Sequence, residues 1–283
     1  MKILLIGKES SISILLASRL KNEGFDIITT SRRSEKNDSI QLDLLDVDSF
    51  LKNPPIVDIV IILAAISEFK ECRNRFEEAN IINKEAPVKI ACHYSQFGTK
   101  VIFLSTSAVF DGCSPNISSL ELQNARSEYG KMKALAEQEL LRMGRNICVL
   151  RFSKVITEKI NIFSTWKDQL LKGEVITCFK DQYISPFNSN LACDILVLLV
   201  KNFKNGIFQF SANSDMSYYE IAIELSKLLN VNKKNIKPVL AIDNQIHQEE
   251  IFRFTSLDST RVLNEFNIPA PSPIDFLDNL IKI

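Results

Sequence analysis

Residues 1–21, MKILLIGKESSISILLASRLK, decide the fold class that this sequence predicts. Residues 3–6 form a continuous apolar run, which is typical of a strand buried on both faces of a parallel sheet. Gly7 ends that run, and apolar residues then recur at helical spacing across residues 12–21. A buried strand, a glycine turn and a helix form the opening of a dinucleotide-binding βαβ unit.

The same alternation continues through the first half of the chain. We predict further strands and helices, in chain order, at 25–30, 57–63, 73–94, 101–105, 128–143 and 147–150. Repeated strand–helix–strand units call for right-handed crossovers and an α/β fold with a doubly wound parallel sheet of the Rossmann type.

After about residue 155 the pattern loosens into shorter pieces. We predict strands and helices there at 175–179, 190–200, 206–210 and 218–229. The sequence therefore predicts a dinucleotide-binding Rossmann domain over residues 1–155. Residues 156–283 are predicted to form mainly a smaller substrate-binding cap, partly interleaved with the Rossmann domain.

Composition excludes several classes of function. Hydrophobic residues make up 46% and charged residues 24%, and the 34 basic residues balance the 34 acidic ones. The sequence has no excess of basic residues, so its charge does not favour nucleic acid or an anionic membrane as a partner. The apolar start is too short for a signal peptide or a membrane span. The six cysteines form no C-x-x-C pair, so we expect free thiols, no metal site and a cytoplasmic location.

The turn after the first predicted strand is a candidate phosphate site. A dinucleotide fold uses three spaced glycines here, for a tight turn, close approach of the pyrophosphate and close packing of helix on strand. Only Gly7 is glycine in this chain, and Ser10 and Ser13 occupy the other two positions. Serine is small and its hydroxyl can donate to a phosphate. An ordinary strand-to-helix turn with a serine cap is the alternative.

The second candidate is Ser31-Arg32-Arg33, which follows the second predicted strand. Enzymes that use NAD usually place a carboxylate here to bind the ribose 2′-hydroxyl. Arginine instead forms charge-assisted pairs with a phosphate, which favours the 2′-phosphate of NADP. A solvated basic loop is the alternative interpretation.

Tyr129 and Lys133 are the third candidate, because a spacing of four residues on a helix places both side chains on one face. A nearby ammonium stabilises a phenolate, so we expect Lys133 to lower the pKa of Tyr129 from its usual value of about 10. Such a phenol can donate or accept a proton.

A polar string over residues 105–112 directly follows a predicted strand, and a hydroxyl there is expected beside a substrate carbonyl. An ordinary polar turn is the alternative.

Taken in order, these strings resemble the extended short-chain dehydrogenase/reductases, and within them the dTDP-4-dehydrorhamnose reductase group. The resemblance runs through nearly the whole chain. It rests on Ser105-Thr-Ser-Ala-Val-Phe-Asp-Gly112 (S-T-D-x-V-F-D-G in the group), Tyr129-Gly-Lys-Met-Lys133 (Y-G-K-x-K), Asn83-Lys-Glu-Ala-Pro87 (N-x-x-A-P), Asp181-Gln-Tyr-Ile-Ser-Pro186 (D-Q-x-x-S-P), Leu63-Ala-Ala65 and Leu42-Asp43-Leu44.

The resemblance implies catalytic roles for four residues. Tyr129 would donate a proton to the oxygen of a keto sugar while the dinucleotide delivers hydride to its carbon. Lys133 would hold the nicotinamide ribose, Thr106 would hydrogen-bond the substrate oxygen, and Asn83 would support a water or backbone link behind Lys133.

The resemblance also implies binding residues, with NADP(H) as the expected cofactor, NAD(H) as the alternative and a nucleotide sugar as the partner. The residues implied to bind the dinucleotide are Gly7, Ser10, Ser11, Ile12, Ser31, Arg32, Asp43, Leu44, Ala64 and Ala65. Those implied to bind the sugar nucleotide are Ser67, Ser107 and Gln182. A homodimer is the assembly that we expect.

Two departures from the group's pattern keep alternatives open. Serines replace two of the three turn glycines, and Ser107 stands where the group has aspartate. One alternative is an epimerase or dehydratase that retains NAD through turnover. The other is a regulatory protein that keeps dinucleotide or sugar-nucleotide binding and has lost catalysis.

Overall fold

The computed structural model describes residues 1–33, 39–144, 146–157 and 161–281, and the chain divides into two compact units. Unit 1 consists of Met1–Val109, Gln123–Arg151 and Cys193–Phe208, and unit 2 consists of Phe110–Leu122, Phe152–Ala192 and Gln209–Ile283. The division crosses the predicted boundary at residue 155 in both directions, because one later segment joins unit 1 and one earlier segment joins unit 2.

Unit 1 is built on a seven-stranded sheet in the order β11-β6-β5-β4-β1-β2-β3. Its strands are β1 (Lys2–Ile6), β2 (Asp26–Ser31), β3 (Ile40–Gln41), β4 (Ile59–Ile62), β5 (Lys100–Thr106), β6 (Ile147–Phe152) and β11 (Gly206–Phe210). β1 pairs in parallel with both β2 and β4, and the pairs β2–β3 and β4–β5 are also parallel. The predicted α/β fold with a doubly wound sheet is therefore confirmed.

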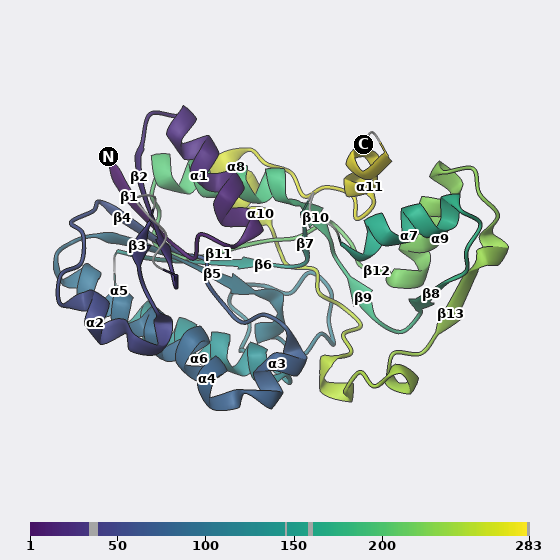
Figure 1. The fold of residues 1–283 in the computed structure, drawn as a ribbon, viewed down its shortest axis with the longest axis horizontal. Helices are drawn as coiled ribbons and strands as arrows, with labels where there is room; N and C mark the ends of the chain where they lie inside the picture. The colour runs from purple at the N-terminus through teal and green to yellow at the C-terminus, as the bar shows by residue number, and fades with distance from the viewer. Residues whose placement is uncertain (34–38, 145, 158–160, 282–283) are drawn as a thin grey trace. The chain divides into compact units, whose positions relative to one another are not determined.

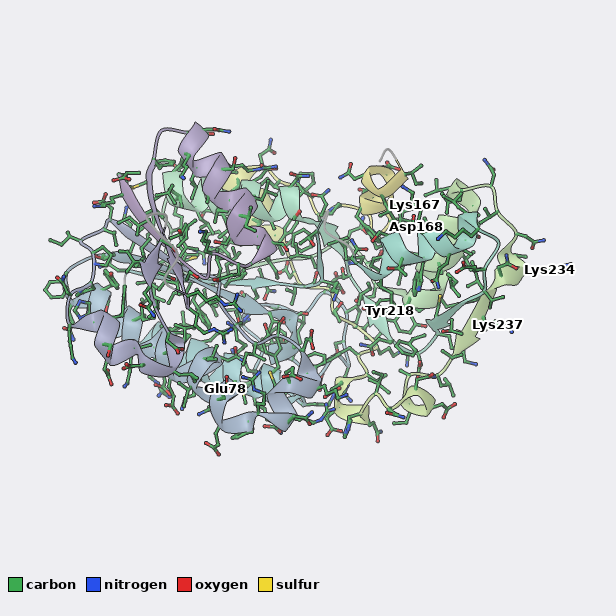
Figure 2. All side chains as sticks on the ribbon, in the orientation of Figure 1. Glu78, Lys167, Asp168, Tyr218, Lys234 and Lys237 are labelled. Atoms are coloured by element: carbon green, nitrogen blue, oxygen red, sulfur yellow. The ribbon has the colours of Figure 1, made fainter. Side chains whose placement is uncertain are left out.

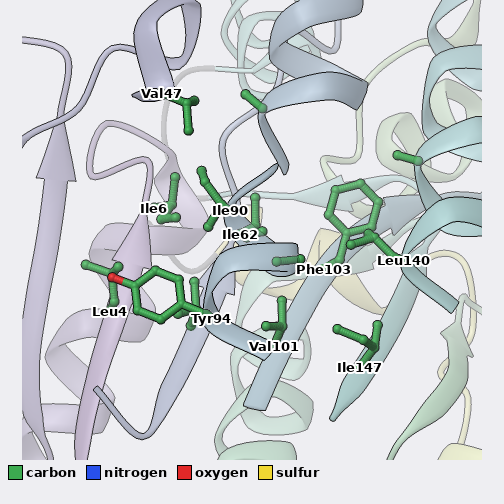
Figure 3. Close-up of a cluster of buried hydrophobic side chains, with 14 of the residues drawn as sticks. Leu4, Ile6, Val47, Ile62, Ile90, Tyr94, Val101, Phe103, Leu140 and Ile147 are labelled. Atoms are coloured by element: carbon green, nitrogen blue, oxygen red, sulfur yellow. The ribbon is translucent and has the colours of Figure 1, made fainter. Parts of the chain in front are cut away.

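Helices cover both faces of this sheet (Figure 1). α1 (Ser11–Asn22) and α8 (Ser189–Lys201) lie on one face, and α2 (Val47–Leu51), α5 (Ala86–Gln96) and α6 (Glu128–Arg142) lie on the other. Figure 3 shows how apolar side chains of the central strands, such as Leu4, Ile62 and Val101, pack against that second set of helices. Because both faces are covered, the buried residues of the central strands β1 and β4 are apolar, as their sequences predicted.

The helical stretch predicted over residues 73–94 is broken in the structure. α3 (Phe69–Asn74) ends at Arg75, whose backbone angles (φ −125°, ψ 50°) are not helical, and α4 (Phe76–Asn80) starts directly after it. A single π-helical turn, Ile81–Glu85, then connects α4 to α5. Such turns insert an extra residue into a helix and are frequent at functional sites.

Unit 2 contains short strands and helices around its own core. The pairs are β7 with β10, β9 with β12 and β8 with β13. Their bounds are β7 (Val155–Ile156), β8 (Ile176–Phe179), β9 (Tyr183–Ile184), β10 (Phe187–Asn188), β12 (Met216–Ser217) and β13 (Ile236–Val239). The helices are α7 (Ile162–Leu171), α9 (Tyr218–Leu228), α10 (Thr260–Phe266) and α11 (Asp275–Ile281). Tyr218, labelled in Figure 2, stacks on Phe163 of α7 in this core.

Candidate active site

A stripe of three side chains on α6 forms the centre of the candidate site. Tyr129, Lys133 and Glu137 recur every four residues, so they lie on one face of the helix. The side chain of Ser127 caps the helix by accepting a hydrogen bond from the N–H of Gly130 at 3.2 Å. A Cβ atom added to Gly130 would lie 2.0 Å from the carbonyl oxygen of Ala108. This glycine therefore lets α6 approach the backbone that follows β5.

Tyr129 and Thr106 are brought together at this contact. Thr106, the last residue of β5, forms a side-chain hydrogen bond with Tyr129. The ring of Phe69 covers the phenol, with ring centroids 5.9 Å apart. Burial raises the pKa of Tyr129 well above its ordinary value, and the bond from Thr106 opposes that rise.

The direction of this pKa shift corrects the prediction that Lys133 lowers the pKa of Tyr129. Lys133 is itself buried, with 1% of its surface exposed, and its ammonium donates to the carbonyl oxygen of Leu104 at 2.6 Å. The same nitrogen lies 3.7 Å from the ring centroid of Phe103. Burial lowers the pKa of Lys133 to about 7, while the nearby Glu137 carboxylate acts to raise it. Desolvation thus dominates both groups.

Asn83 holds the backbone that follows β4. Its side-chain oxygen accepts from the N–H of Ile66 and its amide donates to the Ile66 carbonyl, both at 2.9 Å. The amide also lies near the sulfur atoms of Cys72 and Met132. These hydrogen bonds make Asn83 a clamp on the segment after β4. Its support of a water or backbone link behind Lys133 stays a prediction.

The predicted dinucleotide residues meet where β1 and β4 end. Gly7 has a φ of 102°, and a Cβ atom there would lie 2.8 Å from the Cβ of Ala64. This is the point of the sheet at which the chain changes direction, where α/β proteins bind ligands. Ala65, the next residue, is exposed. A glycine is therefore required at the first position of the turn.

The start of α1 also fits a dinucleotide phosphate. The side chain of Ser10 makes no capping hydrogen bond, and the first turn of the helix, which includes Ser11 and Ile12, contains no acidic residue. The hydroxyl of Ser13 is buried without a hydrogen-bond partner among the described residues. Uncapped N–H groups at a helix start attract anions. A pyrophosphate could therefore be held at the start of α1.

The residues predicted for the adenosine end gather beside β2 and β3. Thr30 and Ser31 pair with Ile40 and Gln41, which brings the chain after β3 next to the end of β2. Asp43 lies two residues after β3, and its carboxylate accepts a hydrogen bond from the N–H of Leu45 at 3.0 Å.

At this end Arg32 is exposed, and Leu44 packs partly against the core. Sequence reasoning missed Glu9, whose carboxylate accepts a hydrogen bond from the hydroxyl of Ser31 at 2.5 Å. The turn after β1 therefore supplies an acidic group where β2 does not. The acidic residue in the middle of the glycine turn was the only available signal.

The three residues predicted to bind the sugar nucleotide lie in different settings. Ser67 is exposed in the segment after β4, and Ser107 begins a short 3-10 helix (Ser107–Val109) after β5. Gln182 lies in unit 2, where its amide donates to the carbonyl of Glu250 at 3.1 Å and its oxygen accepts from the N–H of Phe252 at 2.9 Å. The Gln182 side chain thus braces a loop of unit 2.

Neither a metal cluster nor a membrane span is evident among the described residues. No three or more histidine, cysteine, aspartate or glutamate side chains gather there in a way that could hold a metal ion. Likewise, none of the described helices combines the length and the apolar character needed to cross a membrane.

Three features define the class of nucleotide-binding α/β proteins of the short-chain dehydrogenase/reductase type. They are the sheet topology, the turn at Gly7 and the pair of Tyr129 with Thr106. Within this class, residues 1–272 match the family described as the RmlD substrate binding domain, and the chain belongs to that family.

Curated relatives and solved structures agree with this assignment. The spore coat polysaccharide biosynthesis protein SpsK of Bacillus subtilis is 25% identical over 226 residues, which cover 78% of this chain and 77% of that protein. The methionine adenosyltransferase 2 subunit beta of Bos taurus is 23% identical over 208 residues, covering 67% of this chain and 59% of its own length. The fold also matches the dTDP-4-dehydrorhamnose reductase of Bacillus anthracis in complex with NADP, with a TM-score of 0.86 at 18% identity and coverage of 99% and 98%.

Proposed function

We propose that this chain is an NADP(H)-dependent oxidoreductase that reduces the keto group of a nucleotide-activated sugar. One observation carries the proposal: Tyr129 is hydrogen-bonded to Thr106, on the same helix face as the buried Lys133. Family membership and the NADP complex of the Bacillus anthracis reductase support the cofactor and the substrate class.

The chain's own residues would divide the work as follows. Gly7 and the start of α1 hold the pyrophosphate, and Asn83 fixes the segment after β4 that lies against Gly7. The bound dinucleotide supplies the hydride. Tyr129, which burial keeps protonated at neutral pH, donates the proton to the substrate oxygen. Thr106 orients that oxygen.

Replacement of Tyr129 by Phe tests the reaction. We expect the variant to lose at least a hundredfold in kcat for ketone reduction, because general acid catalysis typically contributes a factor of about 10²–10⁴. Binding of NADPH, followed by fluorescence titration, should change little, since only the proton donor is removed. Tyr94→Phe is the matched control, because Tyr94 is also buried and donates to the carbonyl of Pro55, which is not a candidate residue. Unchanged turnover in the Tyr129 variant would refute the assignment.

A second function, a regulatory subunit without turnover, is favoured by two specific observations. The chain matches methionine adenosyltransferase 2 subunit beta proteins, and Glu9 places a carboxylate in the turn that would receive phosphates. A subunit of this kind would bind dinucleotide and yet leave a panel of keto sugar nucleotides unreduced. A tightly retained NAD, released in one equivalent when the protein is denatured, would instead indicate the epimerase or dehydratase reaction.

A further inference from the structure

Glu137 is a fully buried carboxylate at the end of the stripe on α6. Its exposed fraction is 0%, and that of its partner Arg151 on β6 is 1%. The guanidinium binds it in a fork: Nε lies 3.1 and 3.0 Å from the two carboxylate oxygens, and Nη2 lies 2.6 Å from Oε2. Desolvating two charges is costly, so a pair of this kind contributes little net stability. Net stability therefore does not explain why the pair of Glu137 and Arg151 lies beside the candidate site.

The same carboxylate joins two further segments to α6. Ser105, on β5, donates its hydroxyl to Oε1, and Gln123 donates its amide to Oε2 at 2.5 Å. Ser105 directly precedes Thr106, the residue that is hydrogen-bonded to Tyr129. Gln123 lies in the segment that leads into α6. Three residues, Arg151, Ser105 and Gln123, thus converge on the carboxylate of Glu137.

Glu137 also lies one helical turn beyond Lys133. The charged and titratable side chains that meet this part of α6, from the helix itself, α3, the π-helical turn and β6, are Tyr129, Glu137, Glu139, Cys72, Lys84 and Arg151. Lys84 pairs with Glu139 at 3.2 Å, away from the buried stripe. Of the carboxylates in this set, Glu137 is the one whose charge acts on the Lys133 ammonium.

We propose that Glu137, held by Arg151, is a positioning residue of the reaction: its carboxylate keeps the Lys133 ammonium charged and fixes the end of β5 so that Thr106 faces Tyr129. This inference rests on the proposed function for its catalytic meaning. The effect of Glu137 on the charge of Lys133, which we call the charge component, does not depend on the proposed function, because the ionisation of Lys133 is a property of the protein alone.

Three variants test the charge component. Glu137→Gln keeps the size of the side chain and one acceptor oxygen, removes its charge and turns the other oxygen into an N–H donor. Arg151→Gln leaves Glu137 with Lys133 as its remaining cationic neighbour on the stripe. The double variant Glu137→Gln/Arg151→Gln removes both charges, and it keeps the test open if one single variant does not fold. The pKa of Lys133 is read from the ¹³Cε shift of lysine-labelled protein, assigned with Lys133→Met.

We expect the two single variants to shift the Lys133 pKa in opposite directions. Loss of the carboxylate should lower it by about one unit or more, and loss of the guanidinium should raise it by a similar amount, as nearby charges do. The double variant should fall between them. Glu139→Gln, the same substitution on the same helix, is the matched control and should shift it little. No shift in either single variant, or shifts of the same sign, overturns the proposal.

The alkaline limb of the pH–rate profile for ketone reduction then links the charge to catalysis. We expect that limb to move with the Lys133 pKa in each variant, with kcat affected more than KM for the sugar nucleotide. A brace that acts only on structure would lower the rate at every pH without moving the limb. A wild-type protein that reduces no keto sugar would contradict the proposed function, and the opposite pKa shifts would still decide whether Glu137 controls Lys133.

Discussion

Glu9 and Arg32 place opposite charges at the end of unit 1 that is predicted to take the adenosine. The Glu9 carboxylate accepts from the hydroxyl of Ser31, the last residue of β2, the strand whose end usually reads the ribose. Arg32 is the next residue and is exposed. A carboxylate suits a 2′-hydroxyl and repels a 2′-phosphate, whereas a guanidinium favours the phosphate. The preference between NADP and NAD therefore depends on which charge prevails.

Single substitutions separate these two charges. Arg32→Ala should weaken NADPH binding by up to about fivefold and NADH binding much less, because an exposed charge pair contributes up to about 1 kcal/mol. Glu9→Gln should strengthen NADPH binding by a similar factor, since a repulsive charge is removed. Dissociation constants from nicotinamide fluorescence titrations check both changes. Equal changes for the two cofactors would show that neither side chain senses the 2′-phosphate.

The sequence predicted the residues that meet at the site better than it predicted their electrostatics. Tyr129, Lys133 and Thr106 were identified because helix spacing and strand ends are local features. The direction of the Tyr129 pKa shift was wrong, since burial depends on packing by residues distant in sequence, such as Phe69. Glu137 escaped notice for the same reason: its partner Arg151 lies on another element.

At the scale of elements, the approach of α6 to the end of β5 depends on one glycine. A Cβ atom at position 130 would lie 2.0 Å from the Ala108 carbonyl oxygen and 3.1 Å from the Cβ of Ala125. This carbonyl belongs to the backbone, which cannot rotate away as a flexible side chain could. The helix and the turn after β5 would have to separate, and Tyr129 would move with the helix.

We therefore expect Gly130→Ala to reduce both stability and activity. Overpacking of this kind costs about 1–3 kcal/mol, occasionally more, which urea denaturation would detect as a lower midpoint. The kcat for ketone reduction should fall in the fraction that remains folded, because the hydrogen bond between Tyr129 and Thr106 is stretched. Lys131→Ala, an exposed position on the same helix, is the control. A variant with wild-type stability would show that α6 can shift without cost.

Element boundaries followed the sequence closely where the pattern was periodic. The predicted helix at 128–143 and strand at 101–105 correspond to α6 and β5 within about one residue. The stretch at 73–94 was predicted as continuous because its apolar residues keep a helical period. Its interruption at Arg75 and the π-helical turn that contains Asn83 arise from packing against α6 and from the clamp on Ile66, which no local pattern reveals.

At the scale of the whole molecule, the sheet of unit 1 followed from the alternation of strands and helices, but the exact membership of the two units did not. Most of β11 and most of α8 belong to unit 1 although they lie beyond residue 155. Salt bridges such as Lys201 to Glu23 at 2.6 Å join α8 to the first βαβ segment. Contacts between residues so far apart in sequence are not encoded in hydrophobic periodicity.

The free energy of unfolding should depend on pH because of the buried Lys133. Burial lowers the pKa of this lysine to about 7 from an ordinary value of 10.5, so the folded state releases its proton before the unfolded state does. Between about pH 7 and pH 10 the unfolded chain binds more protons at this position, and the free energy of unfolding must therefore rise with pH. Below pH 7 both states are protonated and the cost of the buried charge is fully present.

Lys133→Met removes this linkage while keeping the apolar length of the side chain. We expect the variant to be more stable than the wild type at pH 6, by roughly 1–4 kcal/mol, because a buried charge gives way to packed apolar atoms. The difference should shrink as the pH rises toward 10, and ketone reduction should be lost at every pH. Urea denaturation followed by circular dichroism at pH 6, 8 and 10 measures the difference. A difference that stays constant over this range would mean that the folded protein does not depress the pKa of Lys133. A difference that shrinks would show that the charged form of Lys133 lowers the free energy of unfolding.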